Sequence, residues 1–173
     1  MRVLYINYES LITNSTLTVR NKESKVEYLI TNQLKNDAEC FIINSLYGDE
    51  LARITQINAG IMPQYKLIQN NKLISKFLRP LNFSNEIFYL SRLHWLVYGN
   101  LLKMNYKIRL FNQEILKTKL VKKVPKRLKI SINTLENEPL CLCIIAILNF
   151  WAKDKMNLEK NELCEKYLAH DLL

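Results

Sequence analysis

The amino-acid sequence predicts a mainly β protein, a closed and mostly antiparallel barrel of about twelve strands around a central, buried hydrophobic C-terminal helix. Two observations predict this fold. Short β-branched or aromatic segments, bounded by polar turn residues, recur over roughly the first 130 residues. An apolar run with no polar face follows at 139–152, and a helix that is apolar all round must be enclosed on every side. Strands wrapped around that helix account for both observations.

Twelve segments carry the strand pattern, and the connections between them are short enough for hairpins. Strands joined so closely must be mostly antiparallel, because a parallel pair needs a crossover of a dozen or more residues. An open sheet of this size would leave unpaired edges, which closure into a barrel removes. The expected strands cover residues 2–8, 17–20, 26–32, 39–44, 51–57, 64–68, 73–78, 86–90, 95–99, 106–111, 115–121 and 127–133.

Asparagine is expected to supply many of the turns, because the chain has 3 glycines but 19 asparagines. Asparagine enters the left-handed backbone conformation more easily than most other side chains. Hairpin turns are predicted at 47–49, 70–71 and 112–113.

The apolar run is predicted to be a core helix rather than a membrane span. As a helix, residues 140–152 are about 20 Å long, whereas the hydrocarbon core of a bilayer needs about 30 Å. Charged residues flank the run, with Glu136 and Glu138 before it and Lys153 and Asp154 after it. The two acids also suit the positive end of the helix dipole.

We expect two parts, a barrel with its central helix over residues 1–155 and a separate amphipathic helical tail over 156–173. The length corresponds to about one domain. Within 158–168 apolar residues recur near the helical spacing, so a second helix with one apolar side is predicted to lie on the surface.

The N-terminus and the cysteines predict a cytoplasmic protein. No secretory signal is visible, because Asn7 and Glu9 interrupt the first apolar segment. The 4 cysteines fit no disulfide framework, and two of them lie inside the apolar run, where a free cysteine acts as a small hydrophobe. Because Cys141 and Cys143 would point about 200° apart on a helix, no metal site is expected there.

The order of these parts resembles the LURP-one-related family of the tubby C-terminal-like superfamily, which also contains the phospholipid scramblases. The resemblance covers about residues 1–155 and is a pattern of strands, turns and an apolar helix. It is carried by LTVRNKESKVEYLI (17–30), CFIINSLYGDELARI (40–54), MPQYKLIQNNKLISKF (62–77), WLVYGN (95–100) and PLCLCIIAILNFW (139–151). It implies a closed barrel with a hydrophobic helix threaded through its centre. The tubby branch binds phosphoinositides, but no residue-level motif for them is found here.

No catalytic or cofactor-binding group stands out, so a non-catalytic protein without cofactor or metal is expected. The 2 histidines, His94 and His170, lie far apart in the sequence without a paired cysteine or aspartate. The glycines are isolated and form no phosphate-binding loop. Asp49 and Glu50 are interpreted as solvated hairpin residues. A hydrolase or lipid-modifying enzyme with dispersed site residues stays open as the competing class.

The sharpest polar feature is a run of basic residues with no acid between Glu114 and Glu136, in a chain of net charge +9. Lys117 and Lys119 alternate with apolar neighbours and are expected to share one strand face. The candidate ligand-binding residues are Lys117, Lys119, Lys122, Lys123, Lys126, Arg127 and Lys129.

Several interpretations of this run stay open. It is either a solvated barrel exterior or a binding surface for an anionic partner. The anionic partners considered are a membrane surface or phosphoinositide-like ligand first, and nucleic acid second. We therefore expect a binding or scaffold protein that is cytoplasmic or peripheral to a membrane, with a nucleic-acid-binding or protein-interaction module as the alternative.

Overall fold

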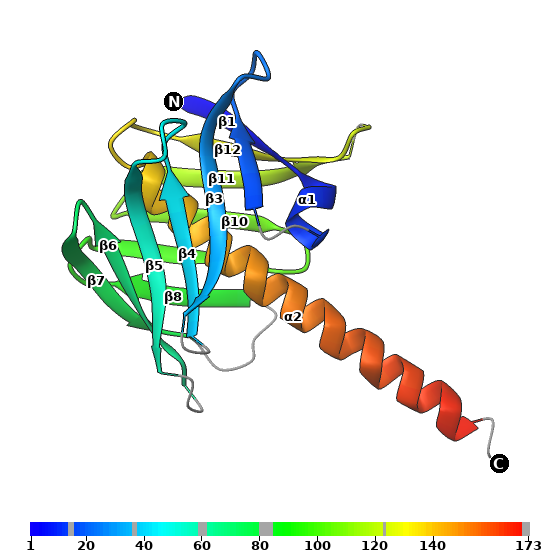
Figure 1. Ribbon diagram of the computed structural model, residues 1–173. Helices are drawn as coiled ribbons and strands as arrows, with labels where there is room; N and C mark the ends of the chain where they lie inside the picture. Colours follow the sequence, from blue (N-terminus) through cyan, green and yellow to red (C-terminus); the bar gives the residue numbers. More distant parts are fainter. Residues whose placement is uncertain (14–15, 36–37, 59–61, 80–84, 123, 171–173) are drawn as a thin grey trace.

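In the computed structural model, a twelve-stranded antiparallel sheet curls around the long helix α2 (Glu138–His170), which confirms the predicted fold class (Figure 1). The structure describes residues 1–13, 16–35, 38–58, 62–79, 85–122 and 124–170. A short helix, α1 (Tyr8–Thr13), follows the first strand. The strands are β1 (Arg2–Asn7), β2 (Thr16–Arg20), β3 (Val26–Lys35), β4 (Ala38–Asn44), β5 (Glu50–Asn58), β6 (Gln64–Gln69), β7 (Lys72–Leu78), β8 (Asn85–Leu90), β9 (Trp95–Asn100), β10 (Asn105–Leu110), β11 (Gln113–Val121) and β12 (Arg127–Ile132).

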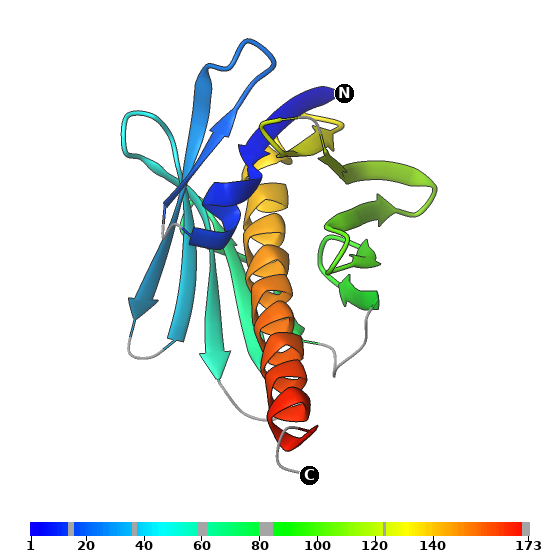
Figure 2. The ribbon, with the colours of Figure 1, turned by 90° about the vertical axis from the view of Figure 1, so that its right-hand side faces the viewer.

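The strand order joins the beginning of the chain to its later part. Strands pair in the order β7-β6-β5-β4-β3-β2-β1-β12-β11-β10-β9-β8, so the first strand lies between β2 and the last strand. The register of β1 on β12 is regular, from Arg2 opposite Ile132 to Asn7 opposite Arg127. Figure 2 shows α2 between the blue-to-cyan strands and the green strands.

The barrel is nearly closed, and its open seam lies between β7 and β8. Within the described ranges, no backbone pairing joins these two edge strands. Instead, the rings of Phe77 and Phe88 stack across the seam with their centroids 4.8 Å apart. Side-chain packing therefore replaces the hydrogen-bonded ladder at this one place.

Every face of α2 is covered where the helix passes through the barrel. From Leu140 to Ala152, all side chains except the partly buried Phe150 are no more than 5% exposed. The Nε1 of Trp151 donates a hydrogen bond of 3.2 Å to the hydroxyl of Tyr65, which satisfies the polar atom of this buried ring. The prediction of a central hydrophobic helix is confirmed.

Two predictions of secondary structure need correction, one on the helices and one on the first strand. The expected helices 139–152 and 158–168 are parts of one continuous α2, because residues 153–157 contain neither proline nor glycine and nothing there ends the helix. The side chains of 158–170, on which the amphipathic pattern depends, lie outside the described part. The strand expected over 2–8 ends at Asn7, whose Oδ1 accepts a 3.1 Å hydrogen bond from the backbone N–H of Glu9 and so caps α1.

Asparagine makes one of the predicted turns, and another turn is shifted by one residue. Asn70 and Asn71 have φ of 49° and 58°, as a tight hairpin requires, and Gly48 turns with φ of 90°. The turn predicted at 112–113 lies at Phe111 and Asn112 instead, with Phe111 at φ 52°.

Candidate functional site: a basic outer face

Four lysines lie on the outer surface of β10, β11 and β12, and we call them the basic face: Lys107, Lys117, Lys119 and Lys129. Their position follows from strand alternation, because the residues between them point into the barrel. Thr118 and Ile130, for example, are fully buried, whereas Lys117 and Lys119 are exposed. Three of the four were predicted from the sequence.

The lysines of the basic face oppose one another across neighbouring strands. Lys119 pairs directly with Lys129, and Lys107 pairs directly with Lys117. Like charges directly opposite each other in an antiparallel sheet are destabilising. The fold therefore gains nothing from this arrangement unless an anion neutralises it.

The remaining predicted cations lie near one end of the basic face. Arg127 alternates with Lys129 and opposes Val121, so it continues the same outer surface. Lys122 and Lys126 flank the hairpin between β11 and β12, where Val124 is 96% exposed. The ammonium of Lys126 lies 5.7 Å from the centroid of the Tyr8 ring, a cation–π contact. Lys123 lies outside the described residues.

The basic face has no carboxylate partner in the described part of the chain. The ion pairs found there join Arg2 to Glu27 and Glu138, Arg53 to Glu50, and Arg79 to Asp154. None of them involves a lysine of the basic face. These ammonium groups are therefore available to an external anion.

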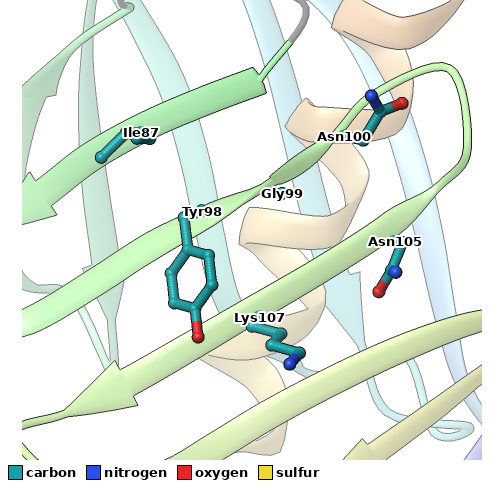
Figure 3. Close-up of a pocket in the computed structure, with 6 residues that line it drawn as sticks. All are labelled: Ile87, Tyr98, Gly99, Asn100, Asn105 and Lys107. Atoms are coloured by element: carbon teal, nitrogen blue, oxygen red, sulfur yellow. The ribbon is translucent and has the colours of Figure 1, made fainter.

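Two pockets lie along this outer surface. A pocket of about 220 Å³ is lined by three lysines of the basic face together with Met1, Thr118 and Ser131. A larger one of about 370 Å³ lies over β8, β9 and β10, where Tyr98 and Lys107 extend side by side from neighbouring strands (Figure 3). The second pocket extends the site beyond the predicted residues.

Sequence reasoning missed Lys107 because it considered only the dense run after Glu114. Lys107 lies in β10 between Tyr106 and Ile108, both fully buried. The same alternation that placed Lys117 and Lys119 would have placed Lys107 on the outer surface. Only the strand pairing, however, brings it next to Lys117.

Other titratable groups form two clusters at the ends of the barrel. At the start of α2, burial raises the pKa of Glu138, and the hydroxyl of Tyr28 and the guanidinium of Arg2 partly offset that rise. Where α2 leaves the barrel, burial and the nearby Asp154 raise the pKa of Glu39 to about 7, against the opposing effect of Arg79. Both clusters hold the helix against the strands.

Among the residues that the structure describes, no three histidine, cysteine, aspartate or glutamate side chains gather in a way that suits a metal ion. His94 contacts Tyr89, whose hydroxyl lies 2.8 Å from its Nδ1. Within the same residues, no helix is both long enough and apolar enough to cross a bilayer.

Comparisons with known proteins identify no relative of this chain. No family model matches it, and neither the curated proteins nor the solved structures contain a match.

Proposed function

We propose that this protein is a non-catalytic binding module that docks onto anionic phospholipid surfaces through its basic face. The observation that carries the proposal is the pairing of Lys107 with Lys117 and of Lys119 with Lys129 on one outer surface. Each pairing costs the folded state stability, and no described carboxylate offsets it. A surface of lipid phosphates and carboxylates supplies many anions at once.

We also propose that the chain is a tubby C-terminal-like barrel of the LURP-one-related kind. What supports this assignment is the order of parts, twelve strands followed by a buried helix in the centre of the sheet. The ligand is argued from the lysines alone, because fold does not imply function.

Co-sedimentation with vesicles tests the proposed function. The full chain is mixed with vesicles of phosphatidylcholine alone or of phosphatidylcholine with phosphatidylserine, each at low and high salt. We expect binding only to the anionic vesicles, weaker at high salt because exposed charges are screened. Each lysine near an anionic membrane surface contributes about 1 kcal/mol to the free energy of binding. Replacing Lys117, Lys119 and Lys129 with glutamine is therefore expected to lower the partition coefficient on the order of 100-fold.

A matched control removes three exposed lysines that oppose no other lysine, by Lys22→Gln, Lys25→Gln and Lys72→Gln. This variant loses the same charge but keeps the basic face, so it should bind within a few-fold of the wild type. Equal losses for both variants would mean that net charge alone drives binding. A gel shift with generic DNA and RNA runs in parallel, and steeply salt-dependent binding there without vesicle binding would favour the nucleic-acid alternative.

A further inference from the structure

The outer surface of β8 and β9 is apolar where that of β10 to β12 is basic. Its side chains form two cross-strand pairs, Ile87 opposite Tyr98 and Tyr89 opposite Leu96. Ile87 is 60% exposed and Tyr89 is 50% exposed, so this is not core packing. With Phe111 from the next hairpin, these residues make up what we call the apolar flank: Ile87, Tyr89, Leu96, Tyr98 and Phe111.

Phe111 is exposed in a position that folding does not explain. It occupies the tight turn between β10 and β11 with φ of 52° and is 80% exposed. A bulky aromatic side chain is disfavoured in the left-handed conformation, where asparagine or glycine fits better. Its ring stacks at 6.2 Å on His94, whose Nδ1 contacts the Tyr89 hydroxyl, so it is aligned with the rest of the flank. A strained, exposed aromatic residue points to a function outside the fold.

The apolar flank meets the basic face without a gap. One row of directly opposed residues crosses four strands, from Ile87 through Tyr98 and Lys107 to Lys117. At the usual strand spacing this row is about 14 Å long. The pocket of about 370 Å³ lies at the junction, with Ile87 and Tyr98 on its apolar side and Lys107 on its basic side (Figure 3).

We propose that the apolar flank inserts into the interface of the bilayer, between headgroups and acyl chains, while the adjoining lysines contact lipid phosphates. This inference rests on the proposed function and adds a direct contact with lipid chains. Peripheral membrane binding combines buried apolar area with attraction of lysines to anionic lipid, and the row from Ile87 to Lys117 provides both within one surface. A second copy of the chain is a poorer occupant, because it would bring a second set of unpaired lysines against the first.

Quenching by brominated lipid tests the insertion directly. The native tryptophans give a background that the wild-type protein measures, with Trp95 at 3% exposure and Trp151 fully buried. A Phe111→Trp variant adds an exposed reporter in the flank, and Tyr47→Trp adds one at a 95% exposed turn between β4 and β5 as the matched control. Anionic vesicles with brominated acyl chains are expected to quench Trp fluorescence of the first variant and not of the second.

Binding measurements separate this inference from the proposed function. The double variant Ile87→Ser, Phe111→Ser is expected to lower the partition into anionic vesicles at least about tenfold, and to remove the binding that survives high salt. Tyr47→Ser should leave both unchanged. Because all three side chains are mostly exposed, these variants are expected to keep the wild-type melting curve.

Each contrary result has a distinct meaning. If the double variant binds like the wild type, or bound Phe111→Trp is not quenched, the insertion is wrong while docking through the basic face stands. If the wild type binds no vesicle, both proposals fall. A concentration-dependent dimer in sedimentation that Phe111→Ser abolishes would assign the flank to a second copy and overturn the insertion.

Discussion

The hydroxyl of Tyr28 in β3 donates a 2.6 Å hydrogen bond to Oε2 of Glu138, the fully buried first residue of α2. Arg2 of β1 lies 3.3 Å from the same carboxylate oxygen. Two strands thus hold the N-terminus of the helix, where a negative charge also complements the helix dipole. Burial raises the pKa of Tyr28, and the bond to Glu138 and its negative charge raise it further.

Removing the Tyr28 hydroxyl should destabilise the protein. We expect Tyr28→Phe to lower the free energy of unfolding by about 1.5–3 kcal/mol, because the buried carboxylate loses a donor and keeps only Arg2. Urea unfolding at neutral pH measures the change. Tyr47→Phe is the matched control, since that side chain is 95% exposed, and equal effects of the two variants would contradict a special role for the bond.

A charge in the middle of α2 should abolish folding. Ile145 is fully buried, and Ile145→Asp places an unpaired carboxyl group in an apolar interior with no partner. We expect insoluble protein or the loss of a cooperative melting transition, whereas Ile145→Val should cost only about 0.5–1.5 kcal/mol. A soluble Ile145→Asp protein with the wild-type melting curve would falsify the central position of the helix.

Glu39 should make the protein less stable as the pH rises. Its pKa is raised to about 7 from an ordinary value of 4.5, so the folded state holds a proton that the unfolded state has released. The free energy of unfolding therefore falls as pH increases from about 4.5 to about 7, and Glu39 adds no further change above that range.

Glu39→Gln removes this ionisation. We expect the free energy of unfolding of the variant to exceed that of the wild type by about 1–2 kcal/mol at pH 8. At pH 4, where both side chains are neutral, this difference should disappear. This difference in the free energy of unfolding is smaller than the full pKa shift would imply, because solvent screens the charge of a side chain that is only partly buried. Thermal melts across the pH range provide the measurement, and an advantage of the same size at pH 4 would contradict the assignment.

Gly99 should tolerate no side chain. A methyl group there would overlap the backbone oxygen of Asn105 and lie 2.7 Å from the Cα of Tyr106, which pairs with Gly99 across β9 and β10. Because backbone atoms cannot move aside without breaking the strand pairing, we expect Gly99→Ala to lower the melting temperature strongly. A methyl group added at Gly48 would meet no atom within 4 Å outside its chain neighbours. Gly48→Ala should therefore show only the smaller cost of a φ of 90°. Similar melting temperatures for the two variants would argue against the close approach.

The strands and the core segment of α2 were predictable because each carries a local pattern. Alternation at Lys117, Thr118 and Lys119 gives the strand faces, and the apolar run from Leu140 gives the buried helix. The capped turn of α1 was missed because β-rich sequence surrounds its six residues. The continuity of α2 was missed because the sequence after Lys155 changes from apolar to amphipathic, although no residue there breaks a helix.

Contacts between distant parts of the chain were beyond sequence reasoning. Tyr28 and Glu138 are 110 positions apart, and nothing local marks them as partners. The pairing of Lys107 with Lys117 depends on the register of β10 on β11, which includes a bulge after Ile108. The apolar flank was not recognised for a related reason, because strand alternation alone does not tell which apolar side chains lie outside the barrel, and only the exposed positions of Phe111 and Ile87 in the folded chain show it.

The position of α2 has a consequence for how the protein is made. The helix follows all twelve strands in the chain, yet it fills the middle of the sheet. At about 5–20 residues per second, the segment from Ile132 to Ala152 takes roughly one to four seconds to synthesise. During that time the inward side chains of the strands lack the helix against which they pack in the folded protein. We therefore expect the sheet to complete its curling only after the helix has been synthesised.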